Sequence, residues 1–265
     1  MNHPSFETLV SEYSNTAEHN DRLHVELTKS TWSDPLLSQH RKYIEENKLG
    51  FGDAAFHSMW SYLLRAAAAR FGSVRALEIG VFKGQVISLL SLLAREHGLS
   101  LSIEGITPLS GNPLPGSRLL RFIKSALNKK FREDLENGNF YAVENYHDVI
   151  TNLFRRFDLN FEDVKIYQGY STDASIIEET KNETYHLIYV DGDHSYAGAL
   201  HDFKTYGPKV VLGGWLVADD AGCDLPGSSF WKGHDAVSRA VRELPAMGFK
   251  NILNVGHNRI YERIE

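Results

Sequence analysis

The chain has 265 residues, enough to bury a substantial core as one large α/β domain or as a domain with a small appendage. Its formal net charge is −6 and it contains no long run of Lys and Arg, which argues against nucleic acid or an anionic membrane as the main partner. Its single cysteine, Cys223, excludes an intrachain disulfide framework and a cysteine-based zinc site. Because the N-terminal residues are polar and no apolar run approaches about 18 residues, we expect a cytoplasmic protein.

Residues 1–72 are predicted to form an N-terminal helical cap. The first fifty are polar and weakly patterned, which indicates irregular structure and short helices that cover the domain. From Asp53, a suitable N-cap, apolar side chains recur at helical spacing as far as Gly72, where a helix can stop. We expect this last helix of the cap to pack on the sheet.

Residues 73–265 are predicted to form a doubly wound, mostly parallel, seven-stranded sheet of the Rossmann-like α/β class. Apolar runs rich in β-formers alternate here with helical periodicity. The expected strands are residues 73–79, 99–106, 164–167, 185–190, the run after Gly213-Gly214, 249–255 and 259–263. The expected helices begin at 86 or span 172–180, 197–206 and 234–244. The last two strands should form an antiparallel hairpin that turns at His257-Asn258.

A long insertion, at about residues 108–160, separates the second strand from the third. It opens with prolines and glycines, and two helices are expected to follow. Connections of this length usually have a function of their own, so we expect the insertion to have one.

Two acidic clusters are the most informative feature of the sequence. Asp191 and His194 follow the predicted strand 185–190, and Asp219 and Asp220 follow the next strand. If these parallel strands are neighbours, about 4.8 Å apart, the three aspartates meet at the carboxyl edge of the sheet. Oxygen ligands suit a hard divalent cation, so we predict Mg²⁺, with Ca²⁺ or Mn²⁺ as alternatives. Zinc is disfavoured because no Cys or His stands at ligand spacing.

A glycine turn joins the first strand to the following helix, at the place where nucleotide-type cofactors dock. Gly80 and Gly84 are four positions apart, and Phe82 stands where a dinucleotide-binding turn needs glycine, which disfavours NAD and FAD. Glu78 lies inside an otherwise apolar strand, where a lone buried carboxylate is costly unless a ligand or a cation partners it. The alternative is that the glycines serve only the turn and that Glu78 merely ends the strand.

Taken together, these motifs resemble the class I S-adenosylmethionine-dependent methyltransferases. Within that class they are similar to the metal-assisted O-methyltransferase branch, which includes the macrocin-type, methyltransferase-24-like sugar enzymes. The resemblance covers about residues 74–263 and is carried by Glu78-x-Gly80-x-x-x-Gly84, by residues 190–196 (VDGDHSY) and by residues 213–220 (GGWLVADD). It implies a donor held around Glu78, Gly80 and Gly84, and Mg²⁺ held by Asp191, Asp219 and Asp220.

The chain departs from this pattern at the end of the second strand. The family commonly has an acidic residue there that binds the donor ribose, whereas this chain has Thr107, which offers only a neutral hydrogen bond. Glu104, three positions earlier, should point to the opposite face of the sheet. After the third strand, Ser171 and Asp173 match the segment beside the adenine, although capping of the next helix explains them equally well.

His194 is the predicted general base, because an ordinary histidine pKa near 6.5 suits removal of the acceptor proton. The alternative is a structural histidine bonded to a carboxylate. The other histidines, His234 among them, are expected to lie on the surface or to cap helices. The loop at 221–235, which contains Trp231, is predicted to be a lid or an acceptor-binding loop.

The sequence therefore predicts a divalent-metal-dependent S-adenosylmethionine O-methyltransferase that acts on a small hydroxylated acceptor, such as a sugar moiety or a vicinal diol. The expected partner is that small molecule, not nucleic acid or a membrane, and a homo-oligomer is left open. Two alternatives remain. One is a metal-independent methyltransferase on the same fold, and the other is a non-methylating Rossmann-like relative, such as a hydroxylase-associated or binding protein.

Overall fold

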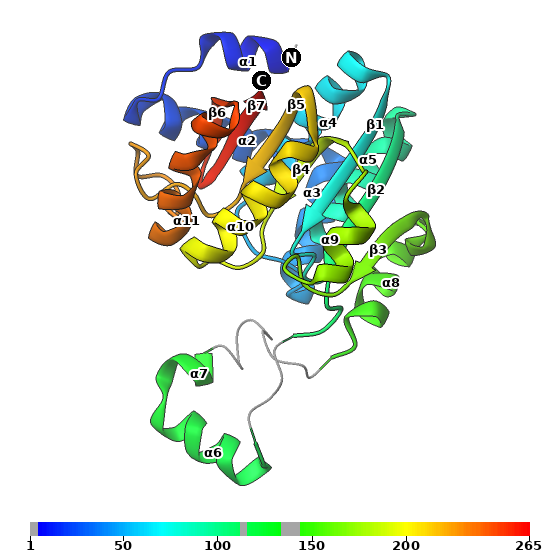
Figure 1. The fold of residues 1–265 in the computed structure, drawn as a ribbon, viewed down its shortest axis with the longest axis vertical. Helices are drawn as coiled ribbons and strands as arrows, with labels where there is room; N and C mark the ends of the chain where they lie inside the picture. Colours follow the sequence, from blue (N-terminus) through cyan, green and yellow to red (C-terminus); the bar gives the residue numbers. More distant parts are fainter. Residues whose placement is uncertain (1–4, 112–115, 134–143) are drawn as a thin grey trace.

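A computed structural model describes residues 5–111, 116–133 and 144–265, and within them one seven-stranded sheet has the order β3-β2-β1-β4-β5-β7-β6 (Figure 1). The strands are β1 Ser73–Ile79, β2 Ser100–Thr107, β3 Val164–Gln168, β4 Tyr185–Val190, β5 Val210–Ala218, β6 Phe249–Val255 and β7 Asn258–Arg263. Neighbours from β3 to β5 pair in parallel, whereas β7 is antiparallel to both β5 and β6. This order confirms the predicted Rossmann-like fold with a C-terminal antiparallel hairpin.

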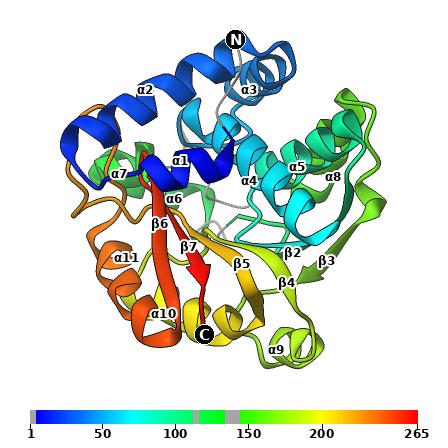
Figure 2. The ribbon, with the colours of Figure 1, turned by 90° about the horizontal axis from the view of Figure 1, so that it is seen from above.

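Helices cover both faces of the sheet. They are α1 Phe6–Glu12, α2 Ala17–Ser33, α3 Pro35–Asn47, α4 Ala55–Phe71, α5 Gln85–His97, α6 Arg118–Leu127, α7 Lys129–Glu133, α8 Tyr146–Arg156, α9 Ala174–Thr180, α10 Tyr196–Tyr206 and α11 Asp235–Ala240. Figure 2 shows α1–α5 and α8 on one side of the sheet and α9, α10 and α11 on the other. Each face of the sheet has its own hydrophobic core. The first core lies under α1–α5 and α8, and the second lies under α9, α10 and α11. Alternate residues of β1 point to opposite faces, so Ala76 packs in the first core and Leu77 in the second.

The fifth strand begins earlier than predicted. Gly213 and Gly214 were expected to precede it, but they lie inside β5. The pairing with β4 shifts register between Tyr185 and Leu187, and Gly213 adopts a φ of 74°. The two glycines therefore form an irregularity within the strand, of the kind that a bulge produces, instead of ending it.

The prediction of irregular structure and short helices in the first fifty residues was wrong. Helix α2 has 17 residues and α3 has 13. Their apolar stripes are narrow, with Leu23 and Leu27 buried on α2 and Leu37 and Ile44 on α3. Two buried aliphatic side chains in a polar segment gave too weak a pattern for long helices to be predicted from the sequence. The burial nevertheless anchors these helices, because Leu23, Leu27 and Leu37 share one core with the sheet.

The insertion after β2 contributes three described helices. Helix α8 packs on the body of the protein, because Ile150 and Phe154 are buried in the first core. Helices α6 and α7 contact each other and lie apart from the sheet, at the lower end of the molecule in Figure 1. The insertion therefore divides into a docked part and a projecting part.

A buried chain of hydrogen bonds joins α3, α4 and α5. His40 Nδ1 lies 2.9 Å from His57 Nε2, and His40 Nε2 lies 3.0 Å from Ser88 Oγ. All three side chains are fully buried or nearly so. Burial lowers the pKa of His40 to about 3 and the pKa of His57 well below its ordinary value. Both imidazoles are therefore neutral at neutral pH, and acid would have to charge them inside the core.

We expect the buried hydrogen bonds of His40 and His57 to make the stability of the protein sensitive to acid. The unfolded state binds a proton on His40 below about pH 6.5 and the folded state does not, so the contribution of His40 to stability is complete above that pH and is lost as the pH falls. The slope of unfolding free energy against pH should differ between wild type and His40→Gln by about 1.4 kcal/mol per unit between roughly pH 5 and 6. Urea unfolding measures it. His97→Gln, at the exposed end of α5, should leave the slope unchanged; equal slopes for wild type and His40→Gln would contradict the assignment.

Candidate functional site

A cavity of about 540 Å³ opens at the carboxyl ends of β1, β4 and β5. Its floor includes Glu78 at the end of β1 and the acidic residues that follow β4 and β5. Its opposite wall comes from α2, from the segment before α4 and from the loop after β5. The cavity thus lies where ligands bind in open α/β sheets, at the carboxyl edge.

The three predicted aspartates come together at this edge. β4 and β5 are parallel neighbours, with Val190 opposite Ala218, and the Asp219 amide donates to the Val190 carbonyl at 3.1 Å. The Asp191 amide donates to the Ile79 carbonyl of β1 at 2.9 Å. Backbone hydrogen bonds therefore set the spacing of the acidic residues. The prediction that the two acid-bearing strands are adjacent is confirmed.

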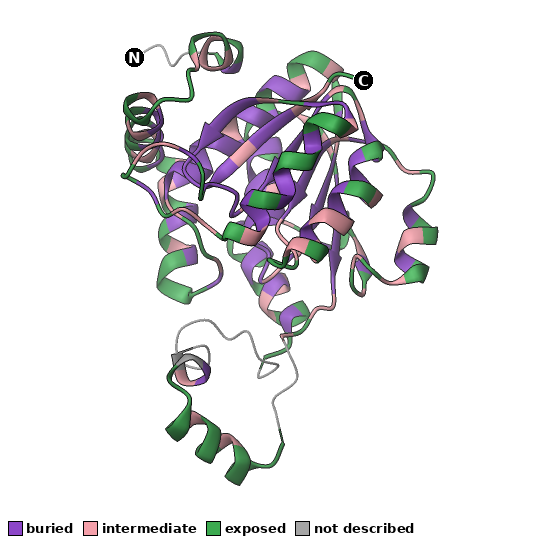
Figure 3. Cartoon of the chain, turned by 60° about the vertical axis from the view of Figure 1, so that its left-hand side comes forward, coloured by how far each residue is buried: buried purple, intermediate pink, exposed green. Residues whose placement is uncertain are grey.

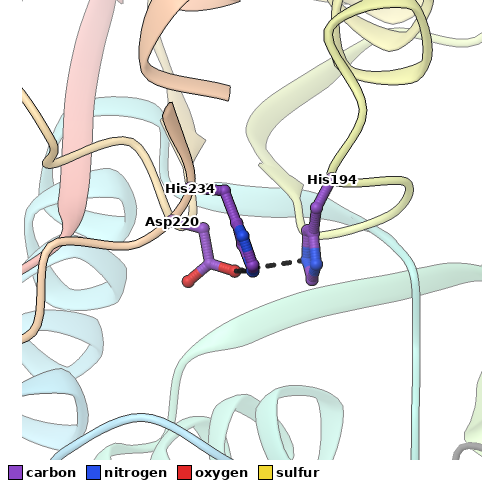
Figure 4. Close-up of side chains that lie close together, drawn as sticks. All are labelled: His194, Asp220 and His234. Atoms are coloured by element: carbon purple, nitrogen blue, oxygen red, sulfur yellow. Dashed lines mark ion pairs between the residues drawn. The ribbon is translucent and has the colours of Figure 1, made fainter. Parts of the chain in front are cut away.

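Three histidines surround the aspartates, and only one of them, His194, was predicted to lie there. His194 Nε2 lies 3.3 Å from Asp220 Oδ2, and His234 Nε2 lies 3.6 Å from the same oxygen (Figure 4). His257 Nε2 lies 3.2 Å from Asp219 Oδ1 and 3.8 Å from Asp220 Oδ1. His234 is exposed and stands at the N-cap position of α11, as expected, but its ring also lies beside Asp220, which was not expected.

No spacing in the sequence connects these histidines, because the fold brings them from three separate places. His194 follows β4, His234 precedes α11, and His257 stands in the turn between β6 and β7. Because β7 pairs with β5 in the antiparallel direction, the turn before β7 lies next to the carboxyl end of β5. Only the position of His257 could have been predicted, because the sequence indicated a hairpin at this residue. Pairing of the hairpin's second strand with β5 places His257 beside the aspartates.

The ionisable groups of this cluster shift one another's pKa values. Burial and the charges of Asp219 and Asp220 raise the pKa of Asp191 well above its ordinary value. Burial and the Asp219 charge raise the pKa of Asp220 to about 7. Burial opposes the charge of His257, but the neighbouring carboxylates, Asp219 first, raise its pKa to about 9. At neutral pH the His257 imidazolium is thus the internal counter-charge of the cluster.

The donor atoms of the cluster fit a divalent cation, but the set is not the oxygen-only set that was expected. One group consists of His194, Asp220 and His234, and a second of Asp219, Asp220 and His257. In each group one ligand atom from every residue lies within 4.8 Å of the others. Imidazole nitrogen suits transition metals better than Mg²⁺. Asp219 and Asp220 could therefore hold Mg²⁺, whereas the group of His194, Asp220 and His234 suits a transition metal such as Mn²⁺ or Zn²⁺. The reason given for disfavouring zinc, the lack of histidines at ligand spacing, was thus wrong, and Asp191 belongs to neither group.

Glu78 has a buried oxygen that no described group satisfies. Its carboxylate accepts a hydrogen bond from the Ile87 backbone at the start of α5, but its Oε2 has no partner. Burial raises the pKa of Glu78 to about 8. Because Glu78 lines the cavity, a cationic or hydrogen-bond-donating group bound there would satisfy Oε2 and favour the charged form.

The glycines of the turn after β1 are required by the turn itself. A Cβ on Gly80 would lie 1.9 Å from the Asp191 carbonyl oxygen, and Gly80 has a φ of 97°. Gly84 has a φ of 88° and lies against Ile150 of α8. Close backbone packing thus explains both glycines without a ligand. Their predicted role in holding the donor stays a prediction.

Three further donor candidates lie outside the residues that line the cavity. Thr107 Oγ1 accepts from the Leu109 amide at 3.1 Å, and Asp173 Oδ2 accepts from the Tyr170 amide at 2.8 Å. The Ser171 carbonyl accepts from the Tyr206 hydroxyl at 2.8 Å. These contacts order the loops at the ends of β2 and β3. The predicted contacts of these three residues with the donor remain predictions.

Glu104 faces away from the cavity, as its position along β2 led us to expect. Its carboxylate accepts from the hydroxyls of Tyr185, at 2.7 Å, and Tyr167, at 2.8 Å. It also forms an ion pair with Arg75 at 2.5 Å. Glu104 is therefore a satisfied buried acid of the opposite face, in contrast to Glu78.

Helix α2, the segment before α4 and the loop after β5 form one wall of the cavity together. His24 of α2 lies 2.8 Å from Asp53 Oδ2 and 3.1 Å from Ser229 Oγ. Asp21, also on α2, accepts from the Ser229 amide at 2.7 Å. The loop carries Trp231, a residue that is 57 % exposed and whose ring meets that of His257 edge to face. The cap thus holds an aromatic side chain beside the acidic cluster.

Comparison with known proteins identifies the family. Residues 77–221, more than half of the chain, match a family described as a methyltransferase domain. The chain belongs to this methyltransferase-domain family. The predicted membership of the methyltransferases is confirmed, whereas the match does not distinguish the metal-assisted branch from the others.

Individual relatives are distant. Protein R132 of Acanthamoeba polyphaga mimivirus, whose function is uncharacterized, is 26 % identical over 186 residues, which are 69 % of this chain and 66 % of the viral protein. The solved structure of the O-methyltransferase NovP is 18 % identical with a TM-score of 0.59, over 94 % of this chain and 99 % of NovP. An O-methyltransferase from Bacillus cereus is 13 % identical with a TM-score of 0.54, over 92 % of this chain and 100 % of that one. These solved structures share the fold.

We expect His257→Gln to destabilise the protein, because it leaves the buried carboxylates without their counter-charge. Loss of one partner of a buried ion pair costs about 3 kcal/mol, measured as the free energy of urea unfolding in EDTA. The double variant His257→Gln/Asp219→Asn should be less unstable than the sum of the two single variants. Simple additivity would show that the ion pair contributes nothing. A control, His147→Gln, changes an exposed side chain of α8 and should have no effect.

Proposed function

We propose that this chain is an S-adenosylmethionine-dependent O-methyltransferase that acts on a small hydroxylated acceptor with the help of a divalent cation. The observation that carries the proposal is one cavity that contains both the unsatisfied Glu78 carboxylate and the cluster of aspartates and histidines. The family supports methyl transfer. The structural relatives from Bacillus cereus, in complex with SAH, and TomG from Streptomyces achromogenes, in complex with SAM, support the choice of donor.

The donor would bind at the end of β1. S-adenosylmethionine supplies an already activated methyl group, so the protein has to orient the donor and the acceptor and remove one proton. Glu78 Oε2 would accept a hydrogen bond from the donor's ammonium group, which satisfies the buried oxygen and restores the charged form of the acid. The turn at Gly80 and Gly84 would place the backbone beside the rest of the donor.

The acceptor would bind on the other side of the cavity. Asp191, Asp219 and Asp220 would hold the cation, and a divalent cation bound there would supply Lewis acidity that favours loss of the acceptor's hydroxyl proton. Burial and the charge of His234 lower the pKa of His194, which favours a neutral imidazole that can accept the hydroxyl proton. The ring of Trp231 would stack on a sugar or an aromatic acceptor.

A second candidate, a metal-independent methyltransferase, is favoured by one specific observation. The His257 imidazolium lies against Asp219 and Asp220 and offsets their charge from inside the protein. A cluster that carries its own cation does not need a metal for charge balance. In that case His194 would remove the acceptor proton with His257 keeping the aspartates in place.

We expect calorimetry to detect S-adenosylmethionine binding to the full chain. Glu78→Gln removes the charge but keeps the size, so it should weaken binding by roughly tenfold or more, the value of one charge-assisted hydrogen bond. Glu96→Gln, on the exposed side of α5, is the matched control and should bind like wild type. Failure of wild type to bind the donor, with or without a divalent cation, would overturn the proposed function. Unchanged binding by Glu78→Gln would remove Glu78 from the donor site.

We expect EDTA-treated protein to bind both Mn²⁺ and Mg²⁺ in calorimetry, with Mn²⁺ the tighter because imidazole nitrogen takes part. Asp219→Asn should weaken both by at least about tenfold. His234→Gln should weaken Mn²⁺ more than Mg²⁺, and His147→Gln should change neither. Donor binding without any metal binding would favour the metal-independent candidate.

The same titration separates two roles of His194. If His194 is the general base, His194→Ala keeps the metal affinity of wild type and loses methyl transfer in an acceptor screen. If it is a ligand, the metal affinity falls with the activity. Its Nε2 lies 3.3 Å from Asp220 Oδ2, so both roles are within reach of this side chain.

A further inference from the structure

Helix α6 exposes a large apolar surface. Five of its ten residues are large and apolar and have exposed fractions between 43 % and 83 %, namely Leu119, Leu120, Phe122, Ile123 and Leu127. None of its residues is buried. Figure 3 shows the helix at the lower end of the molecule coloured almost entirely as exposed. Exposed groups of this kind mark surfaces that meet a partner or a membrane.

The apolar side chains of α6 share one side of the helix. At roughly 100° per residue, the five fall within an arc of about 160°, while Arg118, Arg121 and Lys124 point to the other side. From position 118 to position 133 the sequence has six Lys or Arg residues and one Glu, in a chain whose net charge is −6. The segment is therefore strongly positive against an acidic protein.

We propose that α6 binds the surface of an anionic lipid bilayer. A basic amphipathic helix lies in the plane of the headgroups, with its apolar side among the acyl chains and its Lys and Arg side chains on the lipid phosphates. Among the described residues, no helix has the length and apolar character needed to cross a bilayer, so the contact is with one leaflet. We had expected no membrane partner because the net charge of the chain is −6. That total gives no sign of the local excess of positive charge in α6 and α7.

The positive charge of α6 favours an anionic lipid surface over a second copy of the protein as the partner of its apolar side. A second copy of α6 would bring two positive segments together, which repel each other, whereas anionic headgroups neutralise them. The projecting position of α6, away from the sheet, leaves its apolar side accessible. Methyl transfer would then take place beside the membrane.

Vesicle flotation of the full-length protein tests the proposal. Wild type should float with vesicles of phosphatidylcholine mixed with phosphatidylglycerol, but not with phosphatidylcholine alone, and added salt should release it. Leu119→Ser/Phe122→Ser should abolish binding. Arg118→Gln and Arg121→Gln should each weaken binding roughly fivefold. Leu212→Ser removes a side chain of β5 that is 65 % exposed and should have no effect.

Three results would overturn the proposal. The first is the absence of binding to either vesicle by a wild type that melts cooperatively. The second is equal binding to neutral and anionic vesicles, which would assign no role to the basic side chains. The third is light scattering that shows a wild-type dimer in the absence of lipid and a Leu119→Ser/Phe122→Ser monomer, because a second copy would then cover α6. None of these results depends on the donor or the metal, so the proposed function is tested separately.

Discussion

The candidate site depends on how the protein neutralises carboxylates at the carboxyl edge of its sheet. Asp191, Asp219 and Asp220 are held together by the backbone pairing of β1, β4 and β5, so they cannot move apart to relieve their repulsion. The pKa values of Asp191 and Asp220 rise in response, and that of His257 rises to about 9. Because the strands hold the carboxylates at fixed positions, their negative charge has to be neutralised by nearby positive charge. An imidazolium or a bound cation can supply it.

The order of the sheet explains why this counter-charge comes from the last hairpin. β7 runs antiparallel beside β5, so the turn before β7 returns to the carboxyl edge of the parallel strands. His257 in this turn reaches the aspartates from a position more than thirty residues along the chain. The N-terminal helices act in a related way, because His24 and Asp21 bind the loop that carries Trp231. Both ends of the chain thus complete a site whose centre lies on β1, β4 and β5.

Much of the fold could be read from the sequence because strands in a buried parallel sheet are continuous apolar runs. β1 and β4 have the predicted bounds, and the acidic residues after β4 and β5 were expected to meet. Two kinds of feature escaped. Helices α2 and α3 are held by tertiary packing of a few leucines, which leaves little pattern in a polar sequence. The convergence of His234 and His257 depends on a loop and a hairpin, whose positions follow from the complete sheet and not from local spacing.

The contact between Gly80 and the Asp191 carbonyl has a consequence for variation at this site. The turn that follows β1 and the loop that follows β4 touch through their backbones, and even a methyl group at position 80 would push them apart. A substitution there would displace the Glu78 side and the aspartate side of the cavity at once. A change that adapts one side to a new ligand must therefore leave Gly80 in place. Side chains of the cap and of the loop around Trp231 lie away from this contact, so they can change without pushing the two turns apart.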